Sequence, residues 1–291
     1  MSSHLAALPE VSQRLCKLPA FWPVAARIWE GLDARAGRPE ITPLISLDAA
    51  ITAEILVAAN SPVYGFSSSI YNVHEALTIL EWDHVKRLLH AAVGGRLETD
   101  VRTEPLIQAS WTHSLATAFF ASELAPFFGI PEDRAYMLGL MHDIGRLGML
   151  ATYPGPYLDV AARTYRTSLE CLGSEECVLG MSHCKAGLWL ARVWGLPAEF
   201  SESAAAHHAM VIDSHWPAAT LAGMACRLAH AGGFVFEHCK PVSTEEAISI
   251  APPELLRRLR PRLGEIEARG RSRLLKSMNG FCPLDPLLSR N

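Results

Sequence analysis

The amino-acid sequence predicts an all-α protein. Apolar residues recur at helical spacing through most of the 291 residues, and Pro and Gly residues mark the turns between these segments. No stretch alternates apolar and polar residues over the length of a strand, so no substantial sheet is expected. Hydrophobic residues make up 49% of the chain and charged residues 19%, which indicates a well-buried globular protein rather than a disordered one.

The chain length allows one large unit or two packed subdomains, because 291 residues exceed the usual size of one domain. A looser stretch at residues 94–104 is the candidate boundary between two halves. We therefore expect an N-terminal helical subdomain over residues 1–104 and a second helical subdomain over residues 105–291.

Charge and cysteine content narrow the class of protein. The formal net charge of −4 gives no global attraction for nucleic acid or an anionic membrane, and the basic run at residues 257–262 is interpreted as a solvated helix face. Seven dispersed cysteines without a C-x-x-C pair favour a reducing cytoplasm. The N-terminus lacks a signal-peptide pattern, and no apolar run reaches membrane-spanning length. We expect a cytoplasmic protein that binds neither membranes nor nucleic acid.

The first half is expected to consist of short helices. Pro19 and Pro23 interrupt the helical periodicity of residues 8–35, which predicts two helices joined at a turn. Asp48, at the end of the next segment, is suited to cap the helix that follows. The helices expected after Asp48 cover residues 49–59, 73–80 and 85–93.

Several blocks of this half resemble the HD-related output domain (HDOD) family. The blocks, in order, are residues 18–28, 45–48, 56–61, 64–65 and 70–80. Two positions depart from the family pattern, since Ala49 stands where a proline is usual and Glu81 where a glycine is usual. The resemblance implies an all-helical module of bacterial signal transduction, mostly without demonstrated catalysis.

The second half contains regularly spaced histidines. A long helix is expected over residues 108–128, with His113 in its first turns, and the next helix starts at Pro131 and ends around Gly145. This second helix includes His142 and Asp143, two strong metal-ligand types placed side by side. His113 and His142 are 142 − 113 = 29 positions apart, the length of two antiparallel helices and a turn, so the two side chains can face each other.

Further histidines follow at a similar spacing. A helix is expected at residues 158–167, and Gly180 interrupts the helical run of residues 175–194, which places His183 near the start of a new helix. A helix over residues 199–210 contains the pair His207-His208. The separation 207 − 183 = 24 again corresponds to two helices and a turn.

This order of blocks resembles the HD hydrolase superfamily as it is kept within the HDOD family. The resemblance implies a helical subdomain whose metal ligands are His113, His142, Asp143, His183, His207 and His208. A final Asp is usual, and Cys226 stands at that position, which weakens the first metal position. The ligand set suits one or two divalent transition metal ions (iron, zinc, nickel or manganese), and the chain is expected to bind metal with weak or no catalysis.

Structural roles compete with these assignments. His113 can be a satisfied helix histidine beside Trp111, and His183 can simply begin its helix. Cys184 and Cys226 are more often small buried apolar side chains than ligands. Six further histidines show no partner pattern and are interpreted as surface or structural: His74, His84, His90, His215, His230 and His238.

Three functions compete. The first is a noncatalytic HDOD-type output module with signalling proteins as partners and a small phosphorylated ligand. The second is a metal-dependent phosphohydrolase, in which Lys185 or Arg146 would stabilise a phosphate and Glu175 or Glu176 would accept a proton. The third is cyclic dinucleotide cleavage of the HD-GYP type, which ranks last because neither the Glu nor the Gly-Tyr-Pro segment of that type follows His208.

Overall fold

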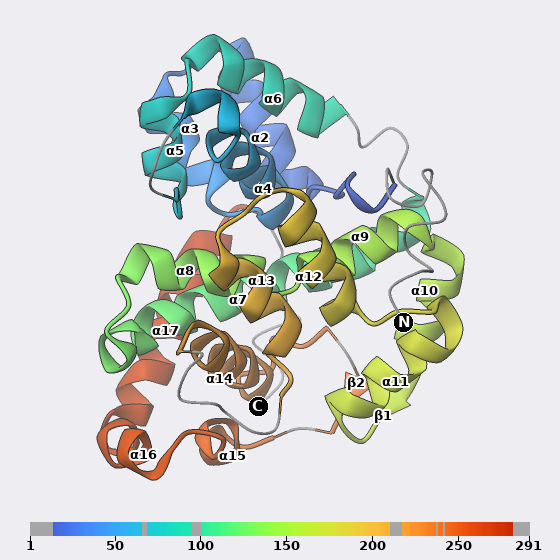
Figure 1. Cartoon of the computed structure of the whole chain (residues 1–291), viewed down its shortest axis with the longest axis vertical. Helices are drawn as coiled ribbons and strands as arrows, with labels where there is room; N and C mark the ends of the chain where they lie inside the picture. Colours follow the sequence, from blue (N-terminus) through green and yellow to red (C-terminus); the bar gives the residue numbers. More distant parts are fainter. Residues whose placement is uncertain are drawn as a thin grey trace.

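The computed structural model describes residues 14–65, 69–94, 100–209, 217–236, 238–240 and 242–281. Its N-terminal half is a group of short helices (Figure 1). These are α2 (Trp22–Asp33), α3 (Arg38–Ile45), α4 (Ala49–Ala59), η2 (Pro62–Tyr64), α5 (Val73–Ile79) and α6 (Trp82–Gly94). The expected helix within residues 8–18 lies largely outside the described residues.

Two local features of this half decide its helix boundaries. Asp48 accepts a hydrogen bond from the backbone N–H of Ile51, so the predicted cap of α4 is confirmed. Its other carboxylate oxygen accepts from Phe21 N, which ties the start of α2 to the start of α4. Helix α3 was not predicted, and the structure accommodates Pro43 inside it.

The second half begins with a 3-10 turn, η4 (Val101–Thr103), and is organised around the 25-residue helix α7 (Glu104–Phe128). The helices that follow are α8 (Glu132–Met141), α9 (Ile144–Thr152), α10 (Pro154–Ala161), α11 (Ser168–Leu179), α12 (His183–Val193) and α13 (Ala198–Ala206). The chain continues with α14 (Pro217–Ala231), α15 (Thr244–Ile248), α16 (Pro253–Leu259), η5 (Arg260–Arg262) and α17 (Leu263–Met278). The only strands among the described residues, β1 (Thr164–Tyr165) and β2 (His238–Cys239), pair in parallel over two residues.

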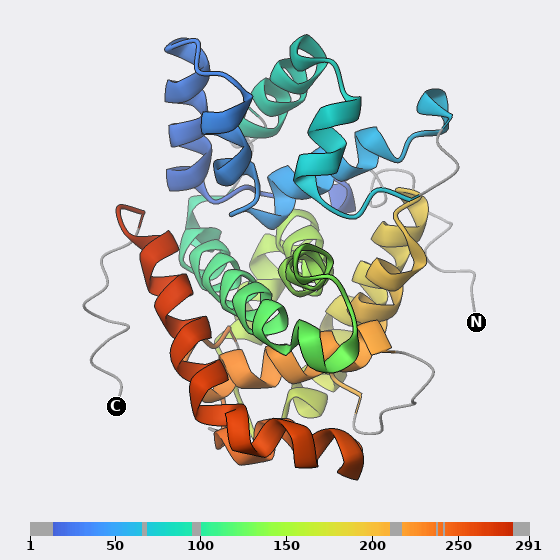
Figure 2. The same cartoon turned by 90° about the vertical axis from the view of Figure 1, so that its left-hand side faces the viewer.

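Helix α7 is almost entirely buried because α8, α14 and α17 pack around it. Figure 2 shows α17, in red, running alongside α7, with the N-terminal helices forming a separate layer above both. Helices α9, α12 and α13 complete the second half, with α12 in contact with both α9 and α13. The crossing of these helices brings their ends together in the interior.

The two halves contact each other through polar and aromatic side chains. The indole N–H of Trp111 donates to the carbonyl oxygen of Leu47 at 2.7 Å, and the Tyr136 hydroxyl donates to Ser46 O at 2.9 Å. Phe21 stacks on the Trp111 ring with centroids 4.4 Å apart. The predicted all-α fold of two packed parts is confirmed, while the division at residue 104, the first residue of α7, stays a prediction.

Within the described ranges, no single helix combines the length and the apolar character needed to span a bilayer. Helices α3 and α4 reach that criterion only when taken together, across a bend of 115°.

Candidate metal centre

The predicted ligands lie at helix ends that meet inside the second half. His113 lies on α7, whereas His142 follows the last residue of α8 and Asp143 directly precedes α9. The sequence predicted one helix through this pair, but the chain turns at His142 and begins a new helix at Ile144. Asp143 occupies the N-cap position of α9 without making a capping hydrogen bond, so its carboxylate faces the interior instead.

The remaining ligands come from the next two helices. His183 is the first residue of α12, and His207 follows the last residue of α13, with His208 next to it. The helix predicted to reach residue 210 thus ends before the histidine pair, and residue 210 lies outside the described part of the chain.

Glycines allow the helices to approach closely at the site. A Cβ on Gly145 of α9 would lie 2.0 Å from the carbonyl oxygen of His183, and one on Gly223 of α14 would lie 2.8 Å from His207 O. Only glycine fits at these two contacts, because any other side chain would force the backbones apart. The glycines therefore fix the separation between the helices that provide the ligands.

Hydrogen bonds at Nδ1 orient the imidazole rings. The Nδ1 atoms of His113 and His142 lie 2.7 Å from the carbonyl oxygens of Phe234 and Gly139. Nδ1 of His207 lies 3.1 Å from Ala204 O. A carbonyl oxygen only accepts, so each of these rings is protonated at Nδ1 and directs the lone pair of Nε2 to the centre of the cluster. Partners of this kind at the outer nitrogen are typical of metal-binding histidines.

Several buried atoms at the centre lack a hydrogen-bond partner among the described residues, namely His142 Nε2, Asp143 Oδ1 and His207 Nε2. Asp143 Oδ1 lies 3.4 Å from His183 Nε2 and 3.6 Å from His207 Nε2. Two ligand atoms about 2.1 Å from one ion, at a tetrahedral angle, are separated by about 3.4 Å. The donor set therefore fits a transition metal ion, and unsatisfied buried polar atoms are otherwise costly.

The structure brings all six predicted ligands into one cluster. Ligand atoms of His183, His207 and His208 lie within 4.8 Å of one another, as do those of His142, Asp143 and His207. The ring centroids of His113 and His142 are 5.2 Å apart. Metal binding by these residues stays a prediction, and the geometry is compatible with it.

Arg146 is the fully buried cation of the site. Its Nε donates to Asp143 Oδ2 at 2.7 Å, and a second nitrogen lies 3.1 Å from His183 Nε2. The guanidinium lies over the Phe236 ring, 4.4 Å from the centroid. Because a guanidinium only donates, the contact with His183 requires an unprotonated Nε2. Arg146 was predicted to bind phosphate, but here it holds one oxygen of the Asp143 carboxylate.

Glu175 orients His183 from the far side. Its carboxylate lies 2.7 Å from Nδ1 of His183 and accepts the His183 backbone N–H at 2.8 Å. The Tyr157 hydroxyl donates to the same carboxylate. Glu175 thus supports a ligand and does not face the centre, where a proton acceptor was proposed. The other two candidates, Glu176 and Lys185, form a partly exposed ion pair with each other.

The surroundings keep three of the histidines and the aspartate in metal-binding protonation states. Burial lowers the pKa of His142 and His208 well below the ordinary range, and it lowers the pKa of His207 to about 4. Burial alone would raise the pKa of Asp143, but Arg146 and the neighbouring histidines together outweigh burial and hold this pKa well below its usual value. These imidazoles are therefore neutral at pH 7 and the carboxylate is ionised.

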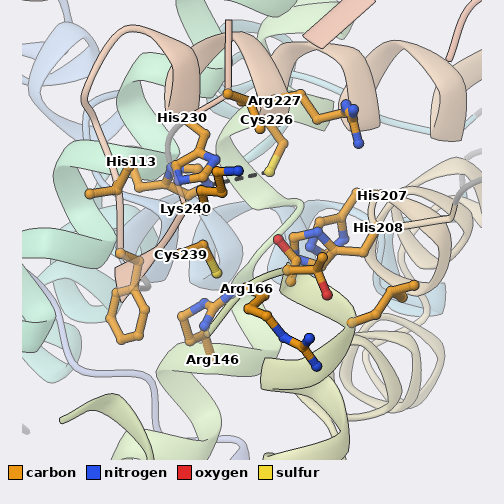
Figure 3. Close-up of a pocket in the computed structure, with 16 residues that line it drawn as sticks. His113, Arg146, Arg166, His207, His208, Cys226, Arg227, His230, Cys239 and Lys240 are labelled. Atoms are coloured by element: carbon orange, nitrogen blue, oxygen red, sulfur yellow. Dashed lines mark hydrogen bonds between the residues drawn. The ribbon is translucent and has the colours of Figure 1, made fainter. Parts of the chain in front are cut away.

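A cavity of about 210 Å³ opens over the cluster (Figure 3). His207, His208 and Cys226 line it together with Arg227 and Lys240. No Asp or Glu belongs to the described lining, which also includes Arg146 and Arg166. His230, interpreted from the sequence as surface or structural, is another lining residue. The cavity therefore offers an anion a cationic path to the cluster.

Cys226 is the residue for which the sequence favoured a purely apolar role. It lies on α14, buried, with Sγ 3.5 Å from His113 Nε2, and its sulfur belongs to one group of possible ligand atoms with His113 and His142. The family pattern gave the only sequence signal, since Cys226 stands where a carboxylate ligand is usual.

Fold and site together define an all-helical protein with an internal histidine and aspartate cluster of the HD type. The sequence model of the HDOD domain matches residues 18–210, about two-thirds of the chain. The chain belongs to the HDOD family.

Solved structures show the same fold. The MmoQ response regulator from Methylococcus capsulatus str. Bath is 19% identical, with a TM-score of 0.63 over 89% of this chain and 97% of that one. A virulence factor from Campylobacter jejuni subsp. jejuni is 18% identical, with a TM-score of 0.64 over 92% of this chain and 99% of that one. An uncharacterized protein from Treponema pallidum (strain Nichols) is 25% identical over 176 residues. The matched region covers 58% of this chain and 33% of that protein.

Proposed function

We propose that this chain is a noncatalytic regulatory module of bacterial signal transduction that binds one transition metal ion in the histidine cluster. Family membership and the fold shared with a response regulator support the signalling role. The unpaired, mutually facing atoms of His142, Asp143 and His207 support metal binding. The seven dispersed cysteines without a C-x-x-C pair support a cytoplasmic location.

The observation that carries this proposal is the convergence of buried ligand atoms without hydrogen-bond partners among the described residues, and the charge of the site bears on how many ions it holds. If all the histidines are neutral, the site carries −1, because Asp143 and Glu175 contribute −2 and Arg146 contributes +1, and all three are at most 2% exposed. One divalent ion changes the net charge from −1 to +1, whereas two would raise it to +3. Uncompensated buried charge is costly, so the site favours a single ion. A metal pair that clamps both the attacking and leaving oxygens of a phosphoester is therefore disfavoured.

A small phosphorylated ligand fits the cavity above the cluster. Arg166, Arg227 and Lys240 line this cavity, Arg166 is paired with Glu170, and no Asp or Glu is among the described lining residues. Binding of such a ligand would change the cavity wall, which includes both α14 and the segment after β2, and a signalling protein could respond to that change. The same cavity favours the second candidate, a metal-dependent phosphohydrolase, because it would admit a phosphoester to the metal.

One pair of assays separates the two candidates. Metal-loaded wild type is titrated calorimetrically with inorganic pyrophosphate, and phosphate release is measured with aryl phosphomonoesters, phosphodiesters and nucleotides. We expect the wild type to bind pyrophosphate without turnover of any of these substrates. In Lys240→Ala the affinity for pyrophosphate should fall about 10-fold, because one favourable charge contact is lost. Turnover that vanishes in His142→Ala would overturn the noncatalytic assignment. Absence of pyrophosphate binding would contradict the proposal that the cavity binds a small phosphorylated ligand.

The signalling role has its own test. The metal-loaded chain and His142→Ala are each used to recover proteins from extracts of the native cell. We expect a signalling protein to be recovered by the wild type. Recovery of no protein partner by either form would contradict the output-module assignment.

A further inference from the structure

The sulfur of Cys226 faces the same point as two histidine nitrogens. Sγ lies 3.5 Å from Nε2 of His113, and Figure 3 marks this contact with a dashed line. A nitrogen of His142 lies within 4.8 Å of both atoms. Cys226 is 4% exposed, and His142 Nε2 is buried without a hydrogen-bond partner among the described residues. Two imidazoles and a sulfur thus converge in the interior.

The separation of sulfur and nitrogen is that of two ligands of one ion. A Zn–S distance of about 2.3 Å and a Zn–N distance of about 2.05 Å, at a tetrahedral angle, place the two atoms about 3.6 Å apart. The observed 3.5 Å agrees with this value. Nδ1 of His113 is held by the Phe234 carbonyl, so the lone pair of Nε2 points to the sulfur side.

Helix packing holds Cys226 in this place. Gly223 lies one turn before Cys226 on α14 and therefore on the same face of the helix. That face is pressed against the site, because a Cβ on Gly223 would lie 2.8 Å from His207 O. The sulfur therefore has little freedom to move away from His113.

The residue type at this position also influences which metal ions the site prefers. A carboxylate at this position would have the same charge, but a thiolate is a softer ligand and shifts selectivity from oxygen-preferring ions to zinc and related ions.

We propose that Cys226 is a thiolate ligand that, with His113 and His142, forms a zinc-type site whose remaining coordination is completed by Asp143 or from the cavity. This inference rests on the proposed metal centre and specifies its metal class. It differs from the aspartate that the family resemblance implies at this position. The thiol proton leaves for solvent when the metal–sulfur bond forms, and no redox change is involved.

Cobalt(II) substitution provides the test, because a thiolate bound to cobalt gives a charge-transfer band in the near ultraviolet, separate from the visible bands of the ion. We expect this band in the wild type and its loss in Cys226→Ala and Cys226→Asp. Cys171→Ala, which removes another buried cysteine outside the ligand groups, should keep it. Zinc affinity should fall in Cys226→Ala by more than the ~10–100-fold caused by loss of an outer-shell partner.

The outcomes separate the two proposals. Cobalt bound with visible bands but without the sulfur band, or a sulfur band that persists in Cys226→Ala, would overturn the thiolate ligand and leave the metal centre in place. Wild type that binds no cobalt would overturn both. If circular dichroism shows that Cys226→Ala does not fold, the sulfur band is compared between the wild type and Cys226→Asp instead. The aspartate restores a ligand of the same charge as the thiolate.

Discussion

Oδ2 of Asp143 accepts a hydrogen bond from Nε of Arg146 across 2.7 Å, while Oδ1 of the same carboxylate lies within 3.6 Å of His183 and His207. One carboxylate therefore connects a buried cation with the histidine cluster. Arg146 also lies 3.6 Å from Glu175 through another nitrogen, so the guanidinium compensates two buried acids. This relationship makes Arg146 both a structural residue and a determinant of how much metal charge the site accepts.

Removal of Arg146 should strongly destabilise the metal-free protein. Arg146→Ala leaves Asp143 and Glu175 buried without their cation, and loss of one partner of a buried ion pair costs about 3–5 kcal/mol. Urea unfolding of metal-free protein measures this change in free energy of unfolding. Arg166→Ala, at an exposed arginine paired with Glu170, should change it by less than about 1 kcal/mol. Equal effects of the two substitutions would contradict the role of Arg146.

The contact between α9 and α12 should not tolerate a methyl group. In Gly145→Ala the new Cβ meets His183 O at 2.0 Å and Gly187 N at 2.4 Å, so the helices must separate. We expect a loss of about 1–3 kcal/mol or more in the free energy of unfolding, together with weaker metal binding because His183 moves. Gly173→Ala, in a helix with open space at its Cβ, should instead stabilise by up to about 1 kcal/mol. A neutral Gly145→Ala would contradict the close packing.

The cap of α4 should make stability depend on pH. Burial raises the pKa of Asp48 to about 6, although the N–H groups of Ile51 and Phe21 lower it. The unfolded value is about 3.9, so between these two pKa values the folded state binds more protons and the contribution of Asp48 to stability falls as pH rises. Below pH ~4 and above pH ~6 this contribution is constant.

Urea unfolding at several pH values, compared with Asp48→Asn, isolates this contribution. The stability of wild type relative to Asp48→Asn should decline by up to about 3 kcal/mol from pH 4 to pH 6.5, because two pKa units correspond to that amount. Asp33→Asn, at an exposed aspartate, serves as the control. If the stability of wild type relative to Asp48→Asn is constant or increases with pH, the raised pKa of Asp48 would be contradicted.

Local patterns in the sequence predicted much of the fold. The cap at Asp48, the long helix that contains His113 and the break at Gly180 all depend on short-range rules, and the structure bears them out. Helix α3 was missed, and it contains Pro43 at the sixth of its eight residues, where proline is usually disfavoured. The boundary between α8 and α9 was missed because periodicity does not reveal a turn between two helices that are both apolar.

The candidate site was predicted less completely. The ligand types and their order were visible, and the structure brings all six predicted residues together. Contacts between distant segments were not visible. The support of His183 by Glu175 and the approach of Cys226 to His113 depend on helix crossings that no local pattern specifies, whereas Arg146 pairs with Asp143 only three positions away. For this reason the sequence left Glu175 as a candidate proton acceptor and favoured an apolar role for Cys226.

Metal content of the purified protein tests the central claim most directly. Wild type, His142→Ala and the surface control His74→Ala are purified without added ions and examined by inductively coupled plasma mass spectrometry. We predict close to one transition metal ion per chain in wild type and His74→Ala, and a large loss in His142→Ala, whose Nε2 faces the centre of the cluster. Wild type without bound transition metal, or equal metal content in all three proteins, would contradict the metal centre.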